Sequence, residues 1–154
     1  MKLGAVIKKE RKRKGLSIQE VADFLGITEE ELVDIESGNS LAEEWGPKLA
    51  QIAIKLETPT SRLISSNGKS DQAGKDEGQC GMLIKAKRRA KGLSQQELAK
   101  LLGISFEEIT SIENGSCPLE LYAPLLLKFA ECIKQPIFNL FYPCGVSFQE
   151  LKDY

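Results

Sequence analysis

The sequence contains no histidine, and its cysteines form no C-x-x-C pair. The four cysteines are Cys80, Cys117, Cys132 and Cys144. A mixed cysteine and histidine zinc site is therefore excluded, and in a reducing compartment the thiols are expected to be free. No G-x-S-x-G motif, phosphate-binding loop or nucleophile with a partner base is present either. We expect no enzyme, no metal site and no cofactor.

Long apolar runs are missing as well. A membrane-spanning helix needs about 18 or more consecutive apolar residues, and no such run occurs. The stretch LGAVI, after Lys2, is too short for the apolar region of a secretory signal and continues directly into lysines. We expect a cytoplasmic protein with no membrane partner.

The chain also lacks an excess of positive charge. It has 21 lysines and arginines against 22 acids, a formal net charge of -1. Attraction to a polyanion must then come from local clusters, such as KKERKRK at 8–14 and KAKRRAK at 85–91. These clusters indicate either phosphate contacts or solvated helix faces that balance nearby acids, and both interpretations remain open.

What the sequence does contain is an internal repeat. A shift of 77 positions aligns KGLSIQEVADFLGITEEELVDIESG at 14–38 with KGLSQQELAKLLGISFEEITSIENG at 91–115, without a gap. The repeat predicts two copies of one domain, at 1–64 and 80–143. The intervening segment 65–79 is rich in serine, glycine and charge, so we expect a flexible linker, with the copies either free or docked. Residues 144–154 form a tail, predicted to add a helical turn after Ser147.

Apolar residues follow a helical spacing throughout each copy, and no stretch alternates as a strand does. The pattern predicts an all-α fold with five short helices per copy. In the first copy we expect them at 2–14, 17–25, 28–36, 46–56 and 60–65, and in the second at 80–91, 94–102, 105–113, 123–133 and 137–142.

The predicted second and third helices of each copy begin with the capping-box pattern, a hydroxyl residue followed three positions later by glutamate. The pairs are Ser17 with Glu20, Thr28 with Glu31, Ser94 with Glu97, and Ser105 with Glu108. Gly26 and Gly103 separate the two helices of each pair. Two helices joined by a tight glycine turn make a helix-turn-helix.

The segment AKGLSQQELAKLLGISFEEITSIENG, and less closely its counterpart in the first copy, resembles the helix-turn-helix domain of the phage repressor and Cro type, the XRE family. The resemblance rests on G-L-S-x-Q-E-x-A, L-G-I and I-E-x-G at the family's spacing, and it covers most of the chain. It implies five-helix domains that form dimers and regulate transcription by reading double-stranded DNA.

In this family the third helix enters the major groove and the start of the second helix meets the phosphates. The resemblance therefore implies DNA contacts in the second copy at Lys85, Arg88, Ser94, Gln95, Gln96, Ser105, Phe106, Glu107 and Ser111. It also implies structural salt bridges that join Arg11 to Glu36 and Arg88 to Glu113.

The first copy departs from this pattern. Its base-reading positions are Glu29, Glu30 and Asp34, and the phosphate-contacting glutamine is replaced by Ile18. One carboxylate about 6 Å from a phosphate costs roughly 0.7 kcal/mol in water, so several acids cost several kcal/mol. We therefore expect the second copy to read DNA, and the first to provide a dimerisation or effector surface, with a protein partner possible on its acidic third helix. The alternative is a protein interaction module that no longer binds DNA.

The fourth helices suggest an interface. Their aromatic and leucine residues exceed what one face of a small helix buries, although core packing is the competing interpretation for the aromatic pair. The residues concerned are Trp45, Tyr122, Leu125, Leu126 and Phe129. Either the two copies pack together as an intramolecular pseudo-dimer, or two chains form a homodimer.

Overall fold

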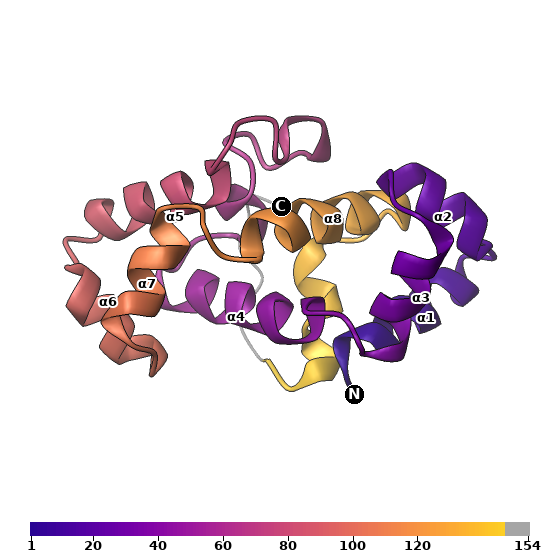
Figure 1. The fold of residues 1–154 in the computed structure, drawn as a ribbon, viewed down its shortest axis with the longest axis horizontal. Coiled ribbons are helices and arrows are strands. Elements are labelled where there is room, and N and C mark those ends of the chain that lie inside the picture. The colour runs from indigo at the N-terminus through magenta and orange to yellow at the C-terminus, as the bar shows by residue number, and fades with distance from the viewer. Residues whose placement is uncertain (147–154) are drawn as a thin grey trace.

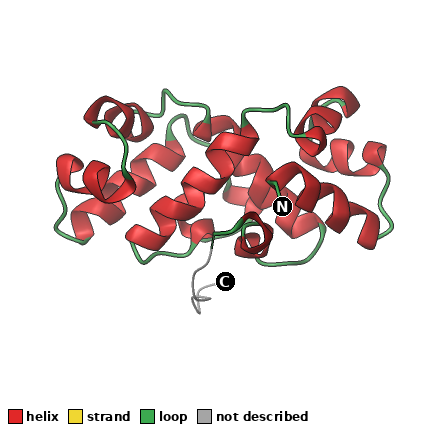
Figure 2. Ribbon diagram, turned by 90° about the horizontal axis from the view of Figure 1, so that it is seen from below, coloured by secondary structure: helices red, strands yellow, loops and turns green. Residues whose placement is uncertain are grey.

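The computed structural model describes residues 1–146, and every regular element within them is helical (Figures 1 and 2). The first copy forms α1 (Leu3–Arg13), α2 (Ile18–Leu25), α3 (Glu29–Ser37), α4 (Ala42–Lys55) and the 3-10 helix η1 (Thr60–Leu63). The second forms α5 (Gln79–Ala90), α6 (Gln95–Leu102), α7 (Phe106–Glu113), α8 (Leu119–Cys132), and the 3-10 helices η3 (Ile137–Leu140) and η4 (Tyr142–Cys144).

The predicted all-α class, with two helix-turn-helix copies in tandem, is confirmed. The fourth helices begin about one turn before their predicted starts, at Ala42 and Leu119. Apolar periodicity misses this first turn because Glu43 and Glu120 occupy it; their carboxylates accept hydrogen bonds from the N–H groups that begin α1 and α5. The predicted turn after Ser147 lies outside the described residues.

Helix caps fix where the helices begin and end. The reciprocal capping box forms at α2, α3 and α6. It is incomplete at α7: Ser105 accepts from the Glu108 backbone, but the Glu108 carboxylate binds Lys48 instead. Gly26 and Gly103 end α2 and α6 with φ of 74° and 71°, which glycine adopts without the steric cost of a Cβ.

The two copies exchange their last helices. In the centre of the molecule α4 packs against α8 (Figure 1). Beyond this crossing, α8 packs against α2 of the first copy, and α4 packs against α6 of the second. The 3-10 helices also pack against the other copy, since η3 contacts α1 and η1 contacts α5. Each helix-turn-helix is therefore completed by helices from the other copy, and the apolar side chains form one continuous core.

This contact pattern has the symmetry of a two-fold rotation. The contact between α2 and α8 is matched by that between α6 and α4, and the contact between α1 and α3 by that between α5 and α7. A two-fold rotation keeps each element at the same height along its axis. The third helices α3 and α7 lie at opposite ends of the molecule (Figure 1).

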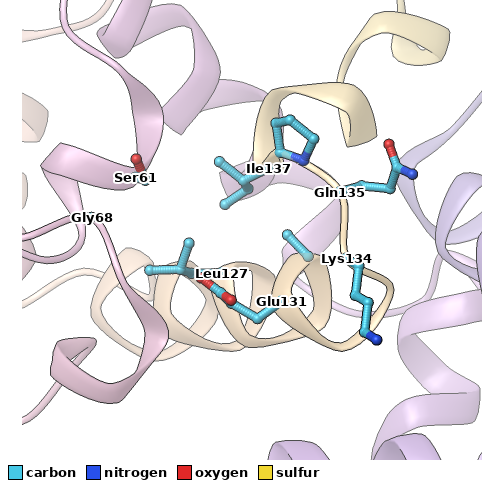
Figure 3. Close-up of a pocket in the computed structure, with 9 residues that line it drawn as sticks. Ser61, Gly68, Leu127, Glu131, Lys134, Gln135 and Ile137 are labelled. Atoms are coloured by element: carbon cyan, nitrogen blue, oxygen red, sulfur yellow. The ribbon is translucent and has the colours of Figure 1, made fainter. Parts of the chain in front are cut away.

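The exchanged contacts are closely packed. Phe129 of α8 is 1% exposed and lies against the helices of the first copy. With Ile7, Leu25 and Leu32 it borders a residual cavity of only about 10 Å³. A larger hollow, of about 220 Å³, lies where Ser61 of η1 faces Leu127 and Ile137 (Figure 3), so it too depends on the packing of one copy against the other.

The expectation of a flexible linker at 65–79 is corrected. The 3-10 helix η2 (Ser70–Gln72) contacts α8, and Ala73 is 7% exposed. The Gln79 side chain donates to the Gln72 carbonyl at 3.0 Å. An argument from composition looks for large apolar side chains and so underestimates the order of this segment. The segment is held instead by turn hydrogen bonds and by the burial of Ser65, Ala73 and Gln79.

A close approach of α5 and α7 requires glycine at position 81. A Cβ there would lie 2.3 Å from the carbonyl oxygen of Ile112. We expect Gly81→Ala to lower the free energy of unfolding by about 1–3 kcal/mol, although alanine is the better helix former. Urea unfolding measures this. Ala86→Gly on the exposed side of α5 is the control, with an expected loss of about 0.5–1 kcal/mol from helix propensity alone. Stabilisation by Gly81→Ala would contradict the close approach.

Candidate nucleic-acid interface

A buried ion pair fixes the third helix of each copy against the first. In the second copy, Arg88 Nε donates to Glu113 Oε2 at 2.6 Å and Nη2 donates to Oε1 at 3.0 Å. Its Nη1 donates to the Leu93 carbonyl at 2.7 Å. Arg11 and Glu36 form the same bidentate pair in the first copy, and the hydrogen bond to Glu36 raises the pKa of Arg11.

The role of Arg88 as a DNA contact is corrected by this geometry. The side chain is buried, and each nitrogen of its guanidinium is engaged inside the protein. The structure supports only a structural role for Arg88, through the salt bridge with Glu113 and the hydrogen bond to Leu93. A sequence does not separate the two roles, because a basic residue in a cationic helix fits both.

The start of α6 presents three polar residues together. Gln95 is half-buried and donates one amide hydrogen to Glu113 Oε1 at 3.0 Å, which leaves the other hydrogen free to donate outward. Gln96 beside it is exposed, as is Ser94, which caps the helix by accepting from the Glu97 N–H at 3.1 Å. In the first copy, Ile18 takes the place of Gln95 and supplies no donor.

The start of α7 places a hydroxyl, a ring and one acid at the surface. Ser105 caps the helix, Phe106 is 46% exposed, and Glu107 is exposed. One turn further on, Ser111 is half-buried, and its hydroxyl shares a hydrogen bond of 3.1 Å with Ser116. Lys85, by contrast, lies near the middle of α5 and not at either of these helix starts.

Sequence reasoning missed Lys48 as a residue of this interface. From α4 of the first copy, its Nζ reaches Glu108 of α7 at 2.6 Å and Glu44 at 3.2 Å, and lies 4.5 Å from the Trp45 ring centroid. Burial by itself lowers the pKa of Lys48, but the hydrogen bonds to Glu108 and Glu44 outweigh it and the net pKa is raised. Lys48 thus stays charged and neutralises an acid of α7. The one sequence signal for Lys48 is that the aligned position of the second copy holds Leu125, so the two copies differ there.

The third helix of the first copy has the opposite electrostatics. Glu29, Glu30, Glu31 and Asp34 are all exposed. None of them has an ion-pair partner within residues 1–146. Glu36 is the exception on α3, since it is buried with Arg11. The two ends of the molecule therefore present unlike surfaces, with four exposed acids on α3 and one, Glu107, on α7.

Of the five residues assigned to an interface from the sequence, Trp45, Leu126 and Phe129 are buried inside the folded chain. Tyr122 and Leu125 are half-buried. Those on α8 line the contact with α1, α2 and α3 of the other copy.

Within residues 1–146, no helix is long and apolar enough to cross a membrane. The same residues contain no group of three or more histidine, cysteine, aspartate or glutamate side chains placed to hold a metal ion. The four cysteines are free thiols, and burial raises the pKa of Cys80 well above its ordinary value.

The capping carboxylates make stability depend on pH. Hydrogen bonds with Ser17 and Ser94 lower the pKa values of Glu20 and Glu97 below the ordinary value of 4.5. A lowered folded-state pKa stabilises the fold above the unfolded value, and this stabilisation is lost as the pH falls through the folded value. We expect E20Q/E97Q to show a smaller drop in Tm between about pH 6 and pH 3 than the wild type. E77Q, which caps no helix, should retain the full drop.

The chain thus contains two helix-turn-helix units that are related by a pseudo-two-fold axis. In each unit a buried ion pair joins the first helix to the third. These features place the protein in the helix-turn-helix class. Comparison with family models matches the helix-turn-helix family over residues 7–43 and 84–129, more than half of the chain. The chain belongs to this family, the XRE type of DNA-binding helix-turn-helix, and contains two tandem copies. Comparisons with curated proteins and with solved structures gave no significant match.

Proposed function

We propose that this protein is a sequence-specific, DNA-binding regulator of transcription in which the α6 and α7 unit reads the DNA. The observation that carries the proposal is the ion pair between Lys48 and Glu108. It leaves Glu107 as the one exposed acid of α7 without a cation.

In the proposed complex α7 lies in the major groove. Ser105 and Ser111 have hydroxyls that donate to base edges, and Phe106 suits the thymine methyl group. Glu107 can accept from a cytosine amino group, which is an ordinary role for a single acid. Ser94, Gln95 and Gln96 at the start of α6 supply phosphate contacts, which set the position of the helix and not its specificity.

The electrostatic balance favours α7 over α3. At roughly 0.7 kcal/mol for each carboxylate near a phosphate, four acids that each face one or two phosphates cost about 3–6 kcal/mol. Specific binding typically exceeds non-specific binding by about 4–10 kcal/mol. The cost at α3 thus removes much of the advantage of a specific site, whereas one acid at α7 does not.

This asymmetry also bears on the DNA sequence recognised. A symmetric pair of reading helices recognises a palindrome with two half-sites. With α3 excluded, we expect a non-palindromic site that corresponds to one half-site, although the chain has the pseudo-two-fold symmetry of a dimer.

Selection from a random duplex library on the full chain tests the proposal. We expect enrichment of one asymmetric sequence, which binds at least about 10³-fold more tightly than a scrambled duplex. Affinity should fall steeply between about 50 and 200 mM salt as counterions are released. If no sequence is enriched and no salt-dependent binding is seen, the proposal is wrong.

The second candidate is a protein interaction module on a helix-turn-helix scaffold that no longer binds DNA. The four exposed acids of α3 favour it, because they disfavour DNA at one of the two third helices. The same salt series separates the two functions, since this candidate requires that DNA binding be absent at about 50 mM salt.

A further inference from the structure

A groove between α3 and α8 separates the acidic helix of the first copy from an exchanged helix of the second. Its volume is about 260 Å³. We call it the α3–α8 groove; its lining consists of Glu31, Asp34, Ile35, Asn39, Ser40, Leu41, Leu121, Tyr122 and Leu125. Because α8 belongs to the second copy, the groove exists only in the exchanged arrangement.

The two walls of the groove differ in chemistry. One wall carries the exposed carboxylates of Glu31 and Asp34, which have no ion-pair partner among the described residues. The α8 wall is formed by Leu121, Tyr122 and Leu125, and Leu121 is 60% exposed. Leu41, which precedes α4 and also lines the groove, is 53% exposed. An exposed apolar edge beside uncompensated acids is typical of a surface that meets another molecule.

The equivalent site in the other half of the molecule shows which chemical group fits beside the acid and the aromatic ring of the groove. The repeat relates Glu31 to Glu108, Tyr122 to Trp45, and Leu125 to Lys48. At the equivalent position the Lys48 ammonium lies between the Glu108 carboxylate, at 2.6 Å, and the Trp45 ring, at 4.5 Å from its centroid. In one half of the molecule, therefore, a cation lies between a carboxylate and an aromatic ring at this place. In the α3–α8 groove the acid and the ring are present, but leucine replaces the lysine.

We propose that the α3–α8 groove binds a segment of a partner protein in which a lysine or arginine stands close to an apolar residue. The cation occupies the place that Lys48 takes in the other half, between the groove carboxylates and the Tyr122 ring. The apolar residue packs on Leu121 and Leu125. Charge complementarity selects this partner over DNA, whose phosphates would face the same carboxylates.

The surface is distinct from the proposed DNA interface, since α3 and α7 lie at opposite ends of the molecule (Figure 1). Partner binding in the groove does not depend on DNA binding by α7, and its absence would leave the role of α7 unchanged. It gives the first copy a function of its own, the recruitment of a basic partner segment by the helix that DNA repels.

Selection of a displayed random 12-residue peptide library on the full chain tests the proposal. We expect enriched peptides to share a lysine or arginine with an apolar residue nearby. A synthetic peptide of the enriched sequence, followed by fluorescence anisotropy, should bind less tightly as salt rises from about 50 to 200 mM. Enrichment of peptides without basic residues would overturn the proposal.

Charge-neutral variants locate the binding. E31Q/D34N should reduce peptide affinity at least about tenfold. Glutamine at position 31 retains the cap on Thr28, so α3 stays folded. E29Q/E30Q is the matched control: it removes the same charge from the same helix outside the groove, and we expect less than about a twofold change. Equal losses in the two variants would mean that general attraction, and not the groove, holds the peptide.

A transplanted lysine gives a second, independent test. Leu125→Lys places the side chain of Lys48 in the groove, and the new ammonium should pair with Glu31 and abolish peptide binding. Circular dichroism checks that the variant is folded; if it is not, E31Q/D34N decides. If light scattering shows a wild-type dimer that Leu121→Ser dissociates, a second copy of the chain occupies the groove and the proposal is wrong.

Discussion

Replacing Arg88 with methionine lowers the free energy of unfolding by about 3–5 kcal/mol. The change leaves the Glu113 carboxylate buried without its bidentate partner and frees the Leu93 carbonyl as well. Removing one partner of a buried pair costs far more than the pair contributes, because the remaining charge is still out of water. Urea unfolding measures the loss, and Arg89→Met, on the exposed side of the same helix, should change stability by less than about 0.5 kcal/mol.

The companion variant R88M/E113L separates the lost charge pair from lost packing. With both charges replaced by apolar side chains, no buried charge is left uncompensated, and most of the lost stability should return. A double variant as unstable as Arg88→Met would contradict this explanation and would assign the cost to the shape of the arginine side chain.

Giving α7 the acids of α3 should remove its DNA binding. F106E/S111D introduces carboxylates at the positions that correspond to Glu29 and Asp34. Two carboxylates that each face one or two phosphates cost about 1.4–2.8 kcal/mol, or roughly a 10- to 100-fold loss of affinity for the selected duplex. Fluorescence anisotropy at about 100 mM salt measures the loss.

The reciprocal change on α3 is the control for that experiment. E29Q/D34N neutralises two acids at the other end of the molecule and should leave affinity for the same duplex within about twofold. A large gain in affinity would show that α3 lies close to the DNA and that its acids limit the complex.

The helix-turn-helix units are predictable from sequence because their determinants are local. Capping hydroxyls, turn glycines such as Gly26 and Gly103, and helical apolar spacing act within one or two turns of the chain. The salt bridge between Arg88 and Glu113 follows from the family resemblance and also lies within one copy. Because these residues and the contacts they make lie within one copy, the sequence of that copy is enough to predict them.

The exchange of α4 and α8 is not predictable in this way. Because the copies are alike, the apolar face of α8 suits the helix-turn-helix of either copy, and apolar spacing does not say which one it covers. The contact between Lys48 and Glu108 depends on that choice, so this feature of the candidate site was missed. The linker prediction failed for a related reason, since burial of Ala73 requires α8 to be beside it.

Amide NMR of the full chain titrated with the selected duplex shows whether the second copy alone reads DNA. We expect shift changes concentrated in residues 94–97 and 105–111, with the equivalent residues 17–20 and 28–34 unchanged. Changes of similar size in both sets, or changes confined to 28–34, would contradict it.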